Sequence, residues 1–123
     1  AGEYNDFEIS RGLSTSRRDR FFKKQPNGMW CLDSAIRRLV TFRNCNILEP
    51  LAWIGSFDCI FCRNLLIYFD NPTKQKIIQQ FHQMLAPDGT LFIGSSENLL
   101  FLERKDAYFQ TLRSGESILY KKV

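Results

Sequence analysis

The sequence predicts an α/β protein built on an open, mostly parallel sheet with an antiparallel edge. Two patterns carry this prediction: a strand–helix–strand succession over residues 57–94, and a pair of alternating segments that closes the chain. Composition is the third observation, since 123 residues that are 44% hydrophobic and 24% charged are typical of one folded domain with its own core. No apolar run approaches the roughly 18 residues that a membrane span needs, so we expect no membrane insertion.

The first third of the chain predicts two short helices and a small hairpin. Apolar residues recur at a broken helical spacing across Glu3–Phe22, with an interruption at Gly12, and Ser14-Thr15-Ser16 can cap the second helix. The segment Phe21–Leu32 is typical of a hairpin, because its central Asn-Gly pair adopts the positive φ angles that a tight turn requires.

A short helix and a strand are expected next. Ser34–Leu39 is the helical candidate, and Val40–Asn46 alternates apolar and polar residues as a strand does. No proline blocks pairing along Val40–Asn46, so we expect it to form an open edge of the sheet. Exposed edges recruit other chains, which predicts that copies of this chain associate with one another.

The strand–helix–strand succession begins at Phe57–Cys62, which is apolar on both faces after its opening Asp58 and so predicts a strand buried on both sides. Asp70–Pro72 combines a capping acid with a first-turn proline, a strong helix start. One apolar stripe of that helix follows, formed by Ile77, Ile78, Phe81, Met84 and Leu85. After a turn at residues 86–89, Thr90–Gly94 is the next strand, reached by a right-handed crossover.

Tyr108–Leu112 and Ser117–Lys121 predict an antiparallel hairpin at the end of the chain. Polar residues follow each of the three strands expected in the parallel part of the sheet. These strand ends are Asn46-Ile47, Arg63-Asn64 and Ser95-Ser96-Glu97. Ligands of open α/β sheets bind at the carboxyl ends of the strands, so we expect the three ends to form a site.

The net charge of +4 arises entirely in the first third, where residues 1–43 carry nine Lys or Arg against five Asp or Glu. The excess is concentrated in one short run that contains Arg17, Arg18, Arg20, Lys23 and Lys24. Such a basic cluster attracts phosphates, acidic lipids or an acidic protein surface, and a solvated helix face is the alternative.

The cysteines predict no metal site. Cys59 and Cys62 are three residues apart in a predicted strand and therefore point to opposite faces, while Cys31 and Cys45 are isolated. His82, the single histidine, lies beside the apolar stripe and is expected to pack there. With no secretory leader and no dense cysteine framework, we expect free thiols in a reducing cytoplasm.

Residues Phe57–Phe69, with the sequence FDCIFCRNLLIYF, resemble the chemotaxis receptor methyltransferase (CheR) family, whose members have a strand ending in Cys-Arg-Asn followed by Ile-Tyr-Phe. The resemblance continues at Asp88-Gly89 and in the GSSE run Gly94–Glu97. It implies a partial Rossmann-like class I methyltransferase sheet with a small β-hairpin subdomain. It also implies S-adenosylmethionine as the methyl donor and glutamates of methyl-accepting chemotaxis receptors as the acceptors.

The resemblance further implies roles for individual residues. Asn46 and Ile47 would border the adenine or ribose, Arg63 and Asn64 would line the cofactor pocket, and Tyr68 would face the reacting carboxylate. The hairpin over residues 21–32, together with the basic cluster beside it, would contact the receptor.

The Gly-rich loop of the family and the acidic residues that hold the ribose are not found in these 123 residues, which resemble the carboxyl-terminal part of a methyltransferase catalytic domain. Losing several hydrogen bonds at about 1 kcal/mol each weakens binding by orders of magnitude, so we expect this chain alone to be inactive. One alternative is a non-catalytic module that docks on receptors or other partners. Another is a nucleic-acid binder that stacks bases on Phe21, Phe22 and Trp30, which so short a basic cluster disfavours.

Overall fold

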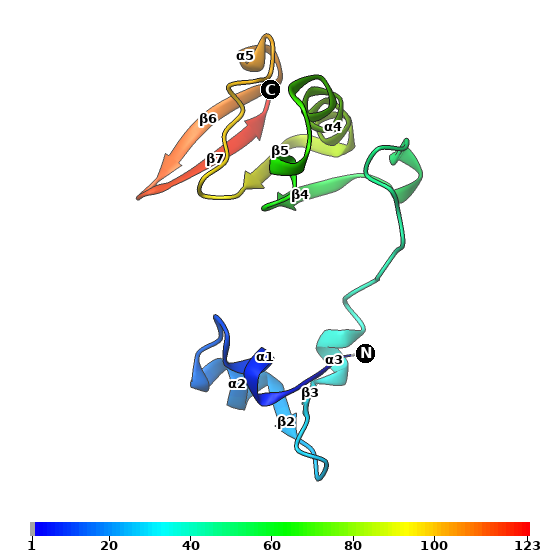
Figure 1. Cartoon of the computed structure of the whole chain (residues 1–123), viewed down its shortest axis with the longest axis vertical. Helices are drawn as coiled ribbons and strands as arrows, with labels where there is room; N and C mark the ends of the chain where they lie inside the picture. The colour runs from blue at the N-terminus through cyan, green and yellow to red at the C-terminus, as the bar shows by residue number, and fades with distance from the viewer. Residues whose placement is uncertain (1) are drawn as a thin grey trace. The chain divides into compact units, whose positions relative to one another are not determined.

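The computed structural model describes residues 2–123, and the chain folds as two compact units (Figure 1). The first unit ends at Asn44 and the second extends from Cys45 to Val123. No helix within the described residues is both long enough and apolar enough to cross a membrane.

The first unit is a three-stranded antiparallel sheet with short helices. Its elements are β1 (Glu3–Tyr4), α1 (Asp6–Ser10), α2 (Thr15–Phe21), β2 (Phe22–Lys24), β3 (Trp30–Leu32) and α3 (Ser34–Arg37). The sheet order is β1-β3-β2, so the predicted hairpin is confirmed as β2 and β3. Strand β1 was not expected; it is two residues long and forms only by pairing with β3.

Local capping explains the helices of the first unit. Asn5 and Glu8 form a capping box at the start of α1. The Ser14 hydroxyl accepts from the Arg17 amide at the start of α2, as predicted. Gly28, at φ 83°, has the left-handed backbone that the hairpin turn requires.

The second unit is a mixed four-stranded sheet with helices. Its elements are η1 (Ala52–Ile54), β4 (Phe57–Cys62), η2 (Leu66–Tyr68), α4 (Asn71–Met84), β5 (Leu85–Ile93), α5 (Lys105–Tyr108), β6 (Phe109–Ser114) and β7 (Ser117–Lys122). The sheet order is β4-β5-β7-β6. The α/β class and the closing antiparallel hairpin are confirmed. The sheet is mixed and not mostly parallel as expected, because β4 with β5 is parallel, whereas β5 with β7 and β7 with β6 are antiparallel.

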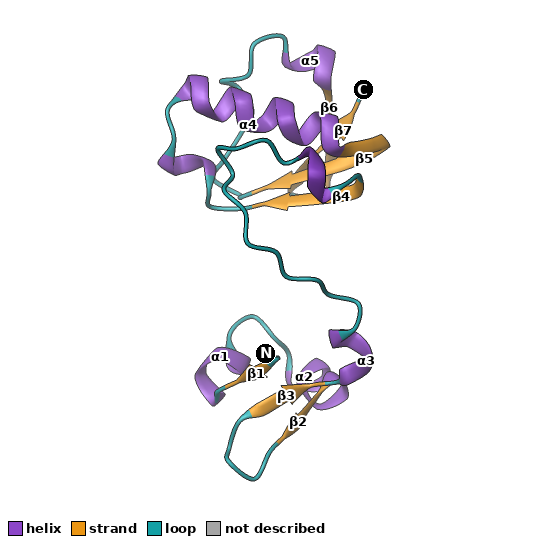
Figure 2. Ribbon diagram, turned by 90° about the vertical axis from the view of Figure 1, so that its right-hand side faces the viewer, coloured by secondary structure: helices purple, strands orange, loops and turns teal. Residues whose placement is uncertain are grey.

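Helix α4 supplies much of the core of this unit. The Asp70 carboxylate caps the helix by accepting from the Thr73 amide, and Pro72 occupies the first turn. The predicted apolar stripe is buried, and α4 runs across one face of the sheet (Figure 2). Each fully buried side chain of this kind contributes roughly 1.5–3 kcal/mol, so the stripe anchors α4 to the sheet.

The structure corrects three further expectations. Val40–Asn46 is not a strand: it has no partner among the described strands, and Phe42 is 86% exposed. The open edge of the parallel pair is therefore β4. The expectation that Phe57–Cys62 is buried on both sides is also wrong: one face of this strand is uncovered, and Phe61 is 70% exposed. Alternation alone cannot make a strand, because a strand also needs a neighbour for its backbone hydrogen bonds.

The third correction concerns residues 86–89, which lie inside β5 rather than before it. The strand starts directly after α4, and its pairing with β4 shifts between Phe57, opposite Leu85, and Cys59, opposite Thr90. A Cβ on Gly89 would lie 2.8 Å from the Ala86 carbonyl oxygen. The glycine thus permits the tight backbone path that takes up the extra residues.

Candidate functional site

The carboxyl ends of β4 and β5 are joined by one carboxylate. Glu97 Oε2 accepts from the backbone amide of Asn64 at 3.1 Å and from that of Gly94 at 2.7 Å. Cys62 and Ile93 are the last paired residues of the two parallel strands; the Asn64 amide lies two residues beyond Cys62, and the Gly94 amide follows directly after Ile93. Two of the three predicted strand ends therefore lie together, as expected for a site at this edge of the sheet.

Asn64 gives the end of β4 a sharp turn. Its φ is 56°, in the left-handed region that asparagine tolerates better than most residues. Both Arg63 and Asn64 are exposed. The turn thus presents two polar side chains beside the end of the sheet.

A cavity of about 550 Å³ lies beside β4 and brings together Ile47, Arg63 and Asn64, three of the predicted site residues. The other lining residues are Leu51, Ile54, Phe57, Cys59, Ile60, Phe61, Cys62, Leu65, Phe81 and Met84. Neither Asn46 nor Tyr68 is among the residues that line it. The cavity is therefore mainly apolar, with polar groups at the strand end.

Asn46 and Ile47 reach this region through a loop and not through the predicted strand. The Asn46 side-chain oxygen accepts from the Leu48 amide at 3.0 Å, and the Asn46 carbonyl accepts from the Glu49 amide. Its amide group thus shapes the turn that carries Ile47, which packs against the core.

Gln80 on α4 holds the same loop from its other end. Its Oε1 accepts from the Leu51 amide at 2.7 Å, and its Nε2 donates to the Glu49 carbonyl at 3.2 Å. Sequence reasoning missed this residue, because it is one of several glutamines on α4 and no local pattern distinguishes it. Glu97 was recognised only as part of a polar strand end, without its bridging role.

Tyr68, the predicted catalytic residue, ends η2 and is 76% exposed. Its ring is therefore open to a large partner and is not enclosed by the cavity.

Cys62 and Cys59 differ in environment, as the predicted alternation requires: Cys62 is buried and Cys59 is exposed. Burial, and then the negative charge of Glu97, raise the pKa of the Cys62 thiol to about 11. The thiol is therefore neutral at pH 7, which fits a packing role and does not fit a nucleophile.

His82 packs as predicted. Its ring meets the edges of Tyr108 and Phe109, with ring centroids 5.1 Å and 5.5 Å away. Burial, and then the charge of Lys122, lower its pKa, against a smaller opposing effect from a hydrogen bond with the Val123 backbone. The imidazole is thus held neutral among aromatic rings, away from the strand ends.

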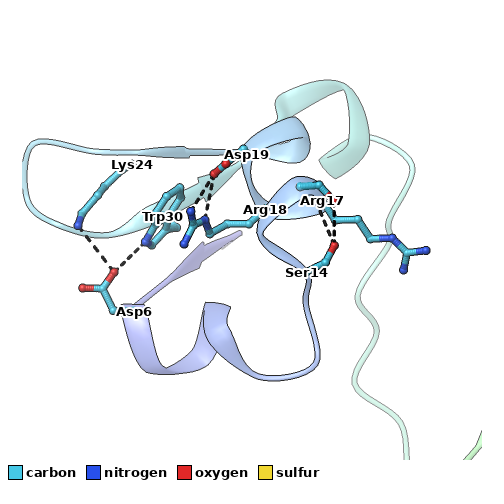
Figure 3. A network of polar contacts seen from close by, with 8 residues as sticks. Asp6, Ser14, Arg17, Arg18, Asp19, Lys24 and Trp30 are labelled. Carbon is cyan, nitrogen blue, oxygen red and sulfur yellow. Dashed lines mark hydrogen bonds and ion pairs between the residues drawn. The ribbon is translucent and has the colours of Figure 1, made fainter.

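In the first unit, the basic cluster divides around Trp30 (Figure 3). The Arg18 guanidinium lies 4.5 Å from the Trp30 ring centroid and pairs with Asp19 at 3.0 Å. Lys24 lies 5.8 Å from the same centroid and 3.8 Å from Asp6, whose carboxylate also accepts from the indole N–H. These contacts place Arg18 and Lys24 beside Trp30 on the surface.

The other three members of the cluster are placed differently. Arg20 and Lys23 line a cavity of about 310 Å³ in the first unit. The Arg17 guanidinium points away from Trp30 (Figure 3). The five charges therefore do not form one continuous patch around a single point.

The chain matches a family described as the CheR methyltransferase, SAM binding domain, over residues 1–116. It is 41% identical over 120 residues to chemotaxis protein methyltransferase Cher2 of Pseudomonas putida, covering 98% of this chain and 42% of that protein. It is 37% identical over 109 residues to the chemotaxis protein methyltransferase of Escherichia coli, covering 85% of this chain and 38% of that protein. The probable biofilm formation methyltransferase WspC of Pseudomonas aeruginosa is 44% identical over 89 residues, covering 71% of this chain and 21% of that protein.

The parallel strand pair, the cavity at its end and the family match define a class, the methyltransferase domains that use S-adenosylmethionine. Within that class, the chain belongs to the CheR methyltransferase family, which confirms the resemblance carried by residues 57–69. The chain spans less than half the length of the curated relatives named above.

The cavity beside β4 fits one part of this cofactor. Its volume of about 550 Å³ falls within the range of small-molecule sites, about 300–1,000 Å³. The apolar lining suits a purine ring, and Arg63 and Asn64 supply polar groups at one end. None of the lining residues is acidic, so the ribose hydroxyls and the amino group find no carboxylate partner in this cavity.

Proposed function

We propose that this chain forms one wall of the cofactor site of an enzyme that methylates glutamate carboxylates of chemotaxis receptors. The observation that carries the proposal is the meeting of Ile47, Arg63 and Asn64 at one cavity beside the end of the parallel strand pair. The names of the relatives, chemotaxis protein methyltransferases, support the receptor as the partner.

In this proposal, Ile47 and the apolar lining contact the adenine, and Asn64 and Arg63 contribute polar contacts. Asn46 acts through the turn that positions Ile47, and its exposed amide borders the ribose. Tyr68 faces the acceptor, since its exposed ring is accessible to a protein substrate.

The sparse set of titratable groups is compatible with methyl transfer to a carboxylate. A glutamate side chain has an ordinary pKa of about 4.3 and is already an anion at pH 7, so no general base is required. The cofactor, when bound, supplies an electrophilic methyl group. The residues of the chain then have to place the acceptor in line and strip water from its carboxylate, tasks that suit apolar walls and a tyrosine.

Affinity for S-adenosylhomocysteine tests the proposal. Because the cavity has no acidic lining residue, we expect this chain alone to bind the compound weakly and to be inactive. A version extended upstream of Ala1 with the Gly-rich loop and acidic residues that the family resemblance implies is expected to bind it well. Calorimetry on both proteins tests this expectation. Micromolar affinity of the chain alone contradicts the proposal that it forms only one wall of the cofactor site. Weak binding by both proteins contradicts the assignment of the cavity to the cofactor.

The first unit is proposed as the receptor-docking element, comprising the hairpin and the basic cluster. Positive side chains that are held in place at low entropic cost, such as Arg18 and Lys24 around Trp30, suit an acidic protein surface. A non-catalytic docking module is the alternative, and it predicts receptor binding by the chain without any methyl transfer in the extended version. Stacking of bases on Trp30 is disfavoured, because Arg18 already lies over its ring.

The chain is also proposed to self-associate and to act in the cytoplasm. The open backbone edge of β4 supports pairing between copies of the chain alone. The free thiols and the chemotaxis relatives support a reducing compartment.

A further inference from the structure

The Glu97 side chain contacts the backbone beyond both parallel strands. Its Oε2 accepts from the amide of Asn64, after β4, and from the amide of Gly94, after β5. The donor partners are 33 residues and 3 residues away in the sequence. The carboxylate therefore forms a tie, the two hydrogen bonds that join the distant Asn64 turn to the loop of Glu97.

The loop of Glu97 is built to admit this carboxylate. The Glu97 amide donates to the Gly94 carbonyl at 3.0 Å, which folds the side chain back over the end of β5. A Cβ on residue 94 would lie 2.5 Å from Glu97 Oε2 and 3.1 Å from the Asn64 side-chain oxygen. Only glycine leaves room there for both groups.

These bonds act on a turn in the left-handed region, which even asparagine, the residue that tolerates it better than most, adopts less readily than glycine. Asn64 has φ 56°, and a non-glycine residue persists in the left-handed region only when its surroundings hold it. The bond from the Asn64 amide to a charged acceptor is of the stronger kind. Without it, the backbone of Arg63 and Asn64 is free to relax toward an extended conformation.

We propose that Glu97 is a positioning residue for the cofactor site: it fixes the Arg63–Asn64 turn so that both side chains point into the cavity beside β4. This inference rests on the proposed function for the role of the cavity. The tie itself is a property of the chain and can be tested without any cofactor.

Two substitutions distinguish the effect of the hydrogen bonds that Glu97 accepts from the effect of its negative charge. Glu97→Ala removes the acceptor. Glu97→Gln keeps an oxygen in the place of Oε2, but it puts an NH₂ donor where Oε1 is now buried without a partner. Glu97→Gln is therefore expected to lower stability while it preserves the turn, so that stability and positioning change independently.

The first measurement is amide hydrogen exchange by NMR on the 123-residue chain. We expect the Asn64 and Gly94 amides to exchange about tenfold faster in Glu97→Ala and to stay near wild type in Glu97→Gln. The control is Asn98→Ala, which removes a bond of the same loop, from the Leu100 amide to the Asn98 side chain, without touching the Asn64 turn. Unchanged exchange of the Asn64 amide in Glu97→Ala overturns the tie.

The second measurement is affinity for S-adenosylhomocysteine in the extended version. We expect Glu97→Ala to weaken it about tenfold and Glu97→Gln to weaken it less than threefold, although Glu97→Gln also lowers the stability of the chain. Equal losses in both variants would overturn positioning and assign the effect to the charge of Glu97. If exchange changes as expected while wild type does not bind the compound, the tie stands and the proposed function fails.

Discussion

Gln80 on α4 and the backbone of Leu51 are joined by a 2.7 Å hydrogen bond, and the same side chain donates to the Glu49 carbonyl at 3.2 Å. One amide group thus satisfies both a donor and an acceptor of the loop that carries Asn46 and Ile47. Since Ile47 lines the cavity beside β4, the helix sets one wall of the candidate site while its apolar stripe packs on the sheet.

Gln80→Leu should therefore destabilise the second unit. Leu51 is only 3% exposed, and its amide would lose its partner, which costs about 1–3 kcal/mol. Urea unfolding measures the effect, with Gln83→Leu as the control because Gln83 is exposed on the same helix. Equal midpoints for the two variants would show that Gln80 does not hold the loop.

Asn64 should contribute to cofactor binding through its side chain. In the extended version, Asn64→Ala is expected to raise the dissociation constant for S-adenosylhomocysteine about tenfold, or about 1.4 kcal/mol, if one good hydrogen bond is lost. Asn64→Gly is the matched control, since glycine keeps the left-handed turn and removes only the side chain. If Asn64→Gly binds like wild type, Asn64 acts through its backbone alone.

Gly94 and Glu97 should be energetically coupled. Gly94→Ala places a Cβ 2.5 Å from Glu97 Oε2 and is expected to destabilise the chain by about 1–3 kcal/mol. In a Glu97→Ala background that clash is absent, so most of the cost should vanish. A double-mutant cycle by urea unfolding gives the coupling, and additive effects would mean that the carboxylate does not occupy the space at residue 94.

Asp70 should make stability depend on pH. Hydrogen bonds from Thr73 hold the folded-state pKa of this carboxyl below its usual value, so its stabilising effect is present above that usual value, about 3.9. The effect is lost as pH falls through the folded-state pKa. Asp70→Asn keeps a cap for the Thr73 amide but cannot titrate, so its unfolding midpoint should fall less between pH 5 and pH 2. Parallel curves for the two proteins would exclude this role.

Self-association should depend on β4. Cys59 is exposed on this edge strand, and Cys59→Lys puts a charge where a second copy would pair. Light scattering at micromolar concentration is expected to show an assembly for wild type and a 14.4 kDa species for Cys59→Lys. Gln110→Lys, on the opposite edge strand β6, should still assemble. A wild-type monomer would rule out pairing at β4.

Local features of the second unit were predictable because their determinants lie close together in the sequence. The Asp70 cap, the first-turn proline and the apolar stripe define α4 within a few residues of one another. The limits of β4 coincide with the predicted strand, and the closing hairpin follows from its alternation and central turn. The CheR resemblance was recognisable for the same reason, since its motif is one continuous run over residues 57–69.

Tertiary structure decided the features that join distant segments. Val40–Asn46 alternates like a strand and remains a loop, whereas β1, two residues long, becomes a strand because β3 lies beside it. The Gln80–Leu51 and Asn64–Glu97 bonds span 29 and 33 residues, and no periodicity or turn preference encodes such a pair. Capping and amphipathic spacing act within a few residues and can be read from the sequence, but a hydrogen-bond partner across the fold exists only after the chain has packed.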